Sequence, residues 1–282
     1  MDASSTLLYG TISGSMRIAI QGDIASFHHI AAMQWQGDDV VIVPCETFDD
    51  VFGALNRHDA ELGVVAIENS LYGGINRVYD LIESHGYPIV GEVHLPIHQQ
   101  LIGTPDTPIT HIYSHPVALA QCQEYLDTHY PEAVRIEYHD TAAAVEFIKQ
   151  QHIPGYAAIA GHQAAVLHDM PIIAENIEDN PANFTRFLVV QPHGTAPADA
   201  NRTSLVITTN HTPGALAGVL GIFAQHTINL SKLQSRPIVG QPWRYRFYLV
   251  LDVAGDQLRA ALKDIEPLTE SLTILGEYKH NL

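Results

Sequence analysis

The feature that most constrains the fold is an alternation of short apolar runs with amphipathic segments, which continues from Met16 to about Gln191. In the helical segments, apolar residues recur at i, i+3, i+4 and i+7, as in Phe48, Val51, Phe52 and Leu55. The apolar runs predict strands at residues 17–20, 40–43, 62–67, 109–113, 134–138 and 156–160. This alternation predicts an α/β domain with largely parallel sheets.

Three local signals indicate where helices begin. Thr47 followed by Asp50 resembles a reciprocal capping pair, with Asp in place of the usual Glu. Pro116 fits the first turn of a helix. Asp140 is suited to the N-cap of a helix that runs through Ile148.

The α/β pattern predicts two lobes. Residues 86–96 mix Gly, Pro and β-branched residues, as expected for an extended crossing. We therefore expect one lobe at about 16–94 and 174–192, and a second at about 95–173. The strand that ends at Val190 would return to the first lobe and place residues 183–187 near the cleft, where ligand sites concentrate.

A separate unit follows a linker at residues 193–201, which is rich in Ala, Pro and Gly. Residues 202–282 predict the order βαββαβ, a ferredoxin-like arrangement. Its first helix would begin after Pro213-Gly214, and one strand would begin near Ile228. Residues 1–15 are small and polar and have no basic segment, so we expect them to be a flexible extension before an α/β domain at 16–192.

Composition excludes several classes of partner. The chain has 31 acidic and 14 basic residues, a formal net charge of −17. Nucleic acids and anionic membrane surfaces both require a basic face, so neither is expected as a partner. No apolar run is long enough to span a bilayer. Cys45 and Cys122 form no CxxC motif, and a cytoplasmic protein with reduced thiols is expected.

The segment Asn183-Phe184-Thr185-Arg186-Phe187 places a hydroxyl beside a guanidinium at the start of an apolar run. Cations are scarce before residue 195: Arg17, Arg57, Arg77, Arg135, Lys149 and Arg186. A guanidinium presents paired donors that match a carboxylate, so Arg186 is a candidate for binding an anionic substrate. The alternative is an ordinary ion pair at Arg186 and a strand-end cap at Thr185.

Other polar clusters follow predicted strands, where α/β sheets bind ligands. They are Glu68-Asn69-Ser70 before Gly73-Gly74, Ser114-His115-Pro116 with Gln121 farther along, and Asp140-Thr141. Helix capping and loop hydrogen bonds are the alternative in each case. Ser114 and His115 do not suggest a nucleophile–base pair, because adjacent residues rarely face each other and a triad needs a third, orienting group.

The 17 histidines do not predict a metal site. His94 and His98 are separated by Pro96, so no helix aligns them. His111 and His115 share a strand face, but no Cys or carboxylate completes either pair at a known ligand spacing. Neither GxGxxG nor a P-loop motif occurs, so no dinucleotide or nucleotide is expected. We therefore expect no cofactor and no metal.

Taken in chain order, these motifs resemble the prephenate dehydratase family, and the unit from about Arg202 onward resembles its C-terminal ACT domain, with Gly214-Ala215-Leu216 and Ser235-Arg236-Pro237. The resemblance implies a two-lobed type II periplasmic-binding-like catalytic domain. It also implies the reaction, in which prephenate loses its ring hydroxyl and ring carboxylate to give phenylpyruvate in L-phenylalanine biosynthesis. Because aromatisation drives the reaction, no cofactor is required.

The resemblance also implies roles for individual residues. Thr185 would be the essential hydroxyl at the leaving group, and Arg186 would bind or neutralise a carboxylate. Glu68 would be a general acid only if burial raised its pKa. His115 would shape its loop, and four residues would position the substrate by hydrogen bonds: Asn69, Ser114, Gln121 and Thr141.

The ACT resemblance implies feedback inhibition by L-phenylalanine, bound where two such domains pair in a homodimer or homotetramer. Gly214, Ala215 and Leu216 would receive the amino acid together with Asn229 and Leu230 of the partner subunit. The Ser235-Arg236 segment belongs to the same motif. Three departures from the family pattern stand out: Gln234 replaces a usual Glu, Ala217 replaces a usual Val, and the loop before His28 and His29 lacks the usual Gly-Pro-x-Gly.

Two alternatives remain open. Arogenate dehydratase acts on a substrate that has an amino group in place of the side-chain keto group. A non-catalytic amino-acid-sensing protein would keep both domains, although a pure binder would have no need of Thr185.

Overall fold

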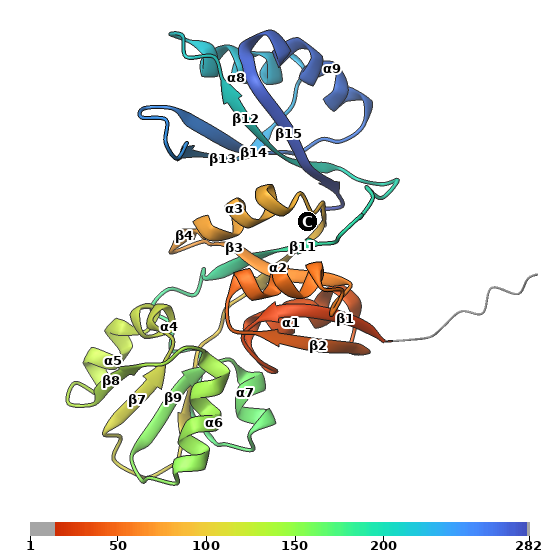
Figure 1. The fold of residues 1–282 in the computed structure, drawn as a ribbon. Helices are drawn as coiled ribbons and strands as arrows, with labels where there is room; N and C mark the ends of the chain where they lie inside the picture. Colours follow the sequence, from red (N-terminus) through yellow and green to blue (C-terminus); the bar gives the residue numbers. More distant parts are fainter. Residues whose placement is uncertain (1–14, 281–282) are drawn as a thin grey trace, which may run out of the picture.

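The computed structural model describes residues 15–280, which form three sheets with helices packed on them (Figure 1). The predicted α/β architecture with a C-terminal βαββαβ unit is confirmed. The predicted flexible extension lies outside the described residues, except for residue 15. In residues 15–280, no helix combines the length and apolarity needed to cross a membrane.

The first sheet has the strand order β2-β1-β3-β11-β5, with the short strand β4 added to β3. Its strands are β1 (Met16–Gln21), β2 (Val40–Cys45), β3 (Leu62–Asn69), β4 (Gly73–Gly74), β5 (Ile89–Pro96) and β11 (Phe184–Val190). β1 is parallel to β2 and β3, whereas β11 is antiparallel to both β3 and β5. The associated helices are α1 (Phe27–Gln36), α2 (Phe48–Asn56) and α3 (Asn76–His85).

The second sheet has the order β10-β6-β9-β7-β8. Its strands are β6 (Gln100–Gly103), β7 (His111–Ser114), β8 (Val134–Glu137), β9 (Tyr156–Ala160) and β10 (Ile172–Ala174). The helices are α4 (Pro116–Gln121), α5 (Gln123–His129), α6 (Thr141–Gln151) and α7 (His162–Leu167). The chain passes between the two sheets after β5 and returns in β11.

The third sheet is antiparallel, with the order β13-β14-β12-β15. Its strands are β12 (Arg202–Thr209), β13 (Leu230–Pro237), β14 (Tyr245–Leu251) and β15 (Thr269–Tyr278). The helices are α8 (Ala215–Gln225) and α9 (Asp256–Ile265), which is followed by a 3₁₀ turn, η1 (Glu266–Leu268). The strand predicted near Ile228 begins at Leu230.

The predicted helix starts are confirmed. Thr47 and Asp50 form a reciprocal capping box at α2. Pro116 occupies the first turn of α4. The side chain of Asp140 accepts hydrogen bonds from the backbone N–H groups of Ala142 and Ala143 at the start of α6.

The C-terminal domain packs directly on the first sheet and on α3, which lies between them (Figure 1). One apolar core joins Tyr79 and Ile82 of α3 to Tyr248 and Leu275 of the third sheet. The approach is closest at Gly276, where an added Cβ would lie 2.1 Å from the backbone oxygen of Ile89. A change in the C-terminal domain therefore bears directly on strands of the first sheet.

Candidate active site

A cavity of about 380 Å³ lies between the two lobes of the catalytic domain. The first lobe contributes the N-terminal turn of α1 and one face of β3 and β11. The second lobe contributes the starts of α4 and α6. The polar and aromatic residues of the lining are Gln21, Ser26, Phe27, His28, Phe48, Asn69, Gln99, His115, Gln121, His139, Asp140, Thr141, Thr185 and Phe187.

The Thr185 hydroxyl stands at the end of a chain of hydrogen-bonded side-chain amides. The Asn69 side-chain amide donates to Thr185 Oγ1 over 3.0 Å and also lies 2.7 Å from Asn183 Oδ1. Asn183 in turn donates to Gln121 Oε1 over 2.9 Å. Because Asn69 donates to Thr185 Oγ1, and no described residue accepts the Thr185 proton, that proton is available to a group in the cavity.

Arg186 does not lie in this cavity, which corrects the expectation that it faces the substrate beside Thr185. Successive side chains of a strand point to opposite faces, so the guanidinium lies on the side of the sheet that the C-terminal domain covers. It donates to Glu92 from Nε over 2.7 Å and to Tyr278 Oη from Nη2 over 2.9 Å. Its side chain is 7% exposed.

Glu68 lies on the same covered face as Arg186. Lys232 of β13 forms an ion pair with one of its oxygens, and Arg186 Nη1 lies 3.3 Å from the other. Burial favours a higher pKa, but Lys232 and Arg186 outweigh it and lower the pKa of Glu68. The general-acid role considered for Glu68 required a raised pKa and access to the cleft. The structure supports neither condition.

The second lobe brings several predicted residues to the site. His115 caps α4 through Nδ1, which accepts from the Val117 N–H, and burial lowers its pKa. Thr141 lines the cavity at the first turn of α6. Ser114 is fully buried behind the cavity, where its hydroxyl donates to the Ile159 carbonyl over 2.6 Å. It therefore positions the β7–α4 loop and does not contact the cavity.

The cavity is neutral to weakly acidic. No Lys or Arg occurs among the described residues that line it, and Asp140 contributes one carboxylate. Positive potential comes instead from the N-terminal end of α1, which opens onto the cavity, whereas the first N–H groups of α6 already bind the Asp140 carboxylate. An anionic ligand would therefore be held by backbone N–H groups and neutral side-chain donors.

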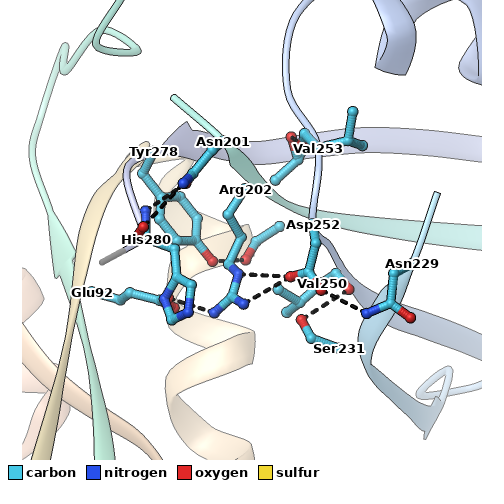
Figure 2. Close-up of polar contacts among 12 residues, drawn as sticks. Glu92, Asn201, Arg202, Asn229, Ser231, Val250, Asp252, Val253, Tyr278 and His280 are labelled. Atoms are coloured by element: carbon cyan, nitrogen blue, oxygen red, sulfur yellow. Dashed lines mark hydrogen bonds and ion pairs between the residues drawn. The ribbon is translucent and has the colours of Figure 1, made fainter. Parts of the chain in front are cut away.

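The face opposite the cavity carries a buried ion-pair network (Figure 2). Glu92 of β5 is bound by Arg186 from the first sheet and by Arg202 from the C-terminal domain, with Nη1 of Arg202 at 2.6 Å. Arg202 also lies 2.7 Å from Asp252. Together with Lys232 and Glu68, these side chains form an alternating row of three cations and three anions across the domain contact.

His94, His280 and Glu92 offer ligand atoms that lie within 4.8 Å of one another, a grouping not predicted from the sequence. The arginines Arg186 and Arg202 bind both carboxylate oxygens of Glu92. A divalent cation there would have to approach two guanidinium groups, so the cluster fits an ion-pair network better than a metal site.

Two residues at the site were not singled out in the sequence: Asn183, which lies buried behind the cavity, and His28, which lines it. Asn183 is fully buried and joins Asn69 to Gln121, although its side chain and theirs come from three distant segments. His28 was left without a role. In the sequence, Asn183 stood out only as the first residue of the segment 183–187. His28 stood out only because it follows a loop that departs from the family pattern.

A second cavity, of about 570 Å³, lies at the start of α8 in the C-terminal domain. Gly214, Ala215 and Leu216 line it together with aromatic residues of the β13–β14 region, among them Trp243 and Tyr245. The other residues proposed for an effector lie outside this lining. Asn229 donates to Asp252, and Arg236 pairs with Asp80 of α3.

A two-lobed α/β domain with an interlobe cavity, joined to a βαββαβ domain with its own cavity, defines a catalytic domain coupled to an ACT-type regulatory domain. Family comparison agrees: the prephenate dehydratase family matches residues 18–195 and the ACT domain family matches residues 203–270. The chain belongs to the prephenate dehydratase family, and its predicted enzyme class is confirmed.

Two relatives illustrate the family. The bifunctional chorismate mutase/prephenate dehydratase of Aquifex aeolicus is 34% identical over 95% of this chain and 75% of its own length. Arogenate dehydratase 4 of Arabidopsis thaliana is 35% identical over 98% of this chain and 70% of its own length.

Two solved structures share the fold over 94% of this chain, each at 29% identity. Prephenate dehydratase from Arthrobacter aurescens in complex with L-Phe aligns with a TM-score of 0.84 and 90% coverage of that chain. A protein described as GqqA, a novel type of quorum quenching acylase, aligns with a TM-score of 0.83 and 98% coverage of that chain. The predicted two-lobed fold with a regulatory domain is thereby confirmed.

Proposed function

We propose that the interlobe cavity binds prephenate and that Thr185 donates its hydroxyl proton to the leaving ring hydroxyl. The observation that carries the proposal is the hydrogen bond from Asn69 to Thr185 Oγ1, which leaves the Thr185 proton for the cavity. A threonine hydroxyl is a weak acid, so its contribution is a hydrogen bond that strengthens as negative charge develops on the departing oxygen. Aromatisation supplies the driving force.

The remaining cavity residues would orient the substrate. Asn69, Asn183 and Gln121 hold one another through side-chain amides, so their geometry is set before the substrate binds. The N-terminal end of α1 and the neutral side-chain donors of the cavity would hold its two carboxylates. Thr141 at the start of α6 would add a donor, and His115 would stay neutral and hold the start of α4 in place.

Arogenate is the second candidate substrate. One observation favours it: the Asp140 carboxylate lines a cavity whose described lining residues include no Lys or Arg, and it would be a partner for an ammonium group. The similarity to arogenate dehydratase 4 of Arabidopsis thaliana also supports arogenate as a substrate. An acylase reaction through a serine nucleophile is less well supported, because the Ser114 hydroxyl is buried and donates to a backbone carbonyl.

We also propose that L-phenylalanine binds at the cavity beside Gly214, Ala215 and Leu216 and inhibits turnover. The Arthrobacter relative solved with L-Phe supports this. The exposed apolar side chains Leu233, Trp243 and Tyr245 on the same domain fit a second copy of the chain, as a homodimer or homotetramer would require. Two cysteines without a disulfide fit a cytoplasmic protein.

The test is direct. Purified protein is incubated with prephenate, and phenylpyruvate is followed with and without L-phenylalanine; arogenate is assayed in parallel for formation of phenylalanine. Turnover of prephenate at the higher kcat/KM supports the proposal, and turnover of arogenate at the higher value supports the second candidate. Turnover of neither substrate would overturn both.

A further inference from the structure

His28, the second residue of α1, lies in the cavity wall next to the strand that carries Thr185. Its ring meets the ring of Phe187 edge to face, with centroids 5.0 Å apart and an interplanar angle of 83°. Phe187 and Thr185 both line the cavity and are two residues apart on β11, hence about 7 Å apart along the strand. His28 and Thr185 therefore both lie in the wall of the same cavity.

The hydrogen bonds of His28 determine its tautomer. The backbone N–H of Ala66 donates to His28 Nε2 over 3.2 Å. A backbone N–H can only donate, so Nε2 must carry a lone pair and, in the neutral ring, the proton must be on Nδ1. Desolvation lowers the pKa of His28 to about 3, so the ring is neutral at physiological pH.

The Nδ1–H group has no partner among residues 15–280. Nδ1 is also not fully shielded from solvent. A neutral donor that faces a ligand cavity and has no protein acceptor is a ready site for a ligand oxygen. The acceptor at Nε2 meanwhile holds the ring in one orientation against β3.

A neutral donor suits the carboxylate that prephenate loses. That carboxylate departs as CO2, so its negative charge decreases towards the transition state. A guanidinium there would stabilise the ground state more than the transition state and would slow the reaction. A neutral N–H orients the carboxylate and stabilises the ground state less than a guanidinium would. The position of Arg186, on the far face of the sheet, agrees with this requirement.

We propose that His28 is a substrate-binding residue whose Nδ1–H donates to the ring carboxylate, the group on the carbon para to the leaving hydroxyl. This inference rests on the proposed function, since it presumes a substrate with that carboxylate. His28 and Thr185 both line the cavity, so each can contact a different group of one bound ring.

Two substitutions separate this role from a structural one. In His28→Gln the side-chain oxygen can replace Nε2 as the acceptor for Ala66, but the Nδ1–H donor is lost. In His28→Asn the amide nitrogen can replace Nδ1–H, but the acceptor for Ala66 is lost. Steady-state kinetics with prephenate and thermal unfolding are measured for both variants and for the wild type.

We expect kcat/KM to fall about 10- to 100-fold in His28→Gln, the size of a lost hydrogen bond to a charged group, with a midpoint of unfolding close to that of the wild type. His28→Asn should retain more activity and unfold at a lower temperature. The reverse order, an active Gln variant and an inactive Asn variant, would show that His28 only supports β3 and would overturn the inference. A wild type that turns over neither prephenate nor arogenate would instead overturn the proposed function and this inference with it.

Discussion

Thr185 and Arg186 are neighbours on β11, yet Thr185 lines the interlobe cavity and Arg186 is buried against the C-terminal domain. Their register partners on β3 divide in the same way: Asn69 pairs with Thr185 and Glu68 with Arg186. Two adjacent residue pairs of the sheet thus carry the contact that we propose for catalysis on one face and the domain contact on the other. A shift of these strands at the domain contact would change the geometry around Thr185.

Replacing Thr185 tests the catalytic face. Thr185→Ala should lower kcat by about 100- to 10,000-fold, because the donor to the leaving group is lost. Thr185→Ser should retain much of the activity, since it keeps the hydroxyl. Phenylpyruvate formation is measured for both. Equal rates in the two variants would remove Thr185 from the mechanism.

Replacing Arg186 tests the opposite face. Arg186→Met leaves Glu92 with one fewer buried partner and should lower the free energy of unfolding by about 3 to 5 kcal/mol. Because the guanidinium lies outside the cavity, KM for prephenate should change little at a temperature where the variant is folded. Urea unfolding and steady-state kinetics measure the two effects. A large rise in KM with unchanged stability would contradict the observed position of Arg186.

Lys232 should transmit the effect of L-phenylalanine, because it is the C-terminal-domain partner of Glu68, the residue before Asn69. Lys232→Met should reduce the L-phenylalanine-dependent change in activity several-fold, while Lys232→Arg, which keeps the charge, should preserve it. Inhibition curves at fixed prephenate concentration measure this. If Lys232→Met were inhibited as strongly as the wild type, the coupling would have to pass elsewhere, for example through Arg202 and Glu92.

Acid should weaken the fold through Glu92. Burial alone would raise its pKa, but His94, Arg186 and Arg202 lower the pKa to about 2, below the value of about 4.3 in an unfolded chain. The unfolded state therefore binds the proton first, and stability that is complete above about pH 4.3 is lost as the pH falls towards 2. The loss is about 3 kcal/mol. Chemical unfolding between pH 7 and pH 3 should already show about 2 kcal/mol of this loss.

Glu92→Gln is the control for this pH dependence. The variant should be less stable at pH 7, because two buried arginines lose their carboxylate. Its stability should then decline less steeply below pH 4.5 than that of the wild type. A decline as steep as in the wild type would assign the acid sensitivity to other carboxylates.

Gly276→Ala tests the domain contact itself. A Cβ at this position would lie 2.1 Å from the Ile89 carbonyl oxygen, and the backbone there cannot move as a flexible side chain can. We expect a fall of several degrees in the midpoint of unfolding and a weaker response to L-phenylalanine. Gly221→Ala is the control, because its Cβ would have no neighbour within 4 Å. Similar losses in both variants would contradict the domain contact as the cause, because Ala is favoured over Gly within a helix.

Local signals in the sequence predicted the elements well. The capping box of Thr47 and Asp50 and the cap at Asp140 involve residues within three positions of each other, so the sequence contains all the partners. Hydrophobic periodicity likewise reports only whether a segment has an apolar face. These features need no knowledge of distant contacts, which is why the βαββαβ order and the two-lobed α/β architecture could be predicted.

The site was predicted less completely, because its contacts are distant in the chain. Asn183 acquires its role from Asn69 and Gln121, which lie 114 and 62 residues away. The tautomer of His28 depends on the backbone of Ala66, 38 residues on. Neither relation leaves a local pattern.

The sequence alone determined that Thr185 and Arg186 share a strand, and strand geometry required them to face opposite ways. Which of them faces the cavity was decided by the tertiary structure, because the second lobe covers one face of the first sheet and the C-terminal domain covers the other. Glu68 and Glu92, on the face covered by the C-terminal domain, supply the anions that a buried guanidinium needs. Burying the Arg186 guanidinium without these two carboxylates would cost more free energy than the rest of the fold could offset.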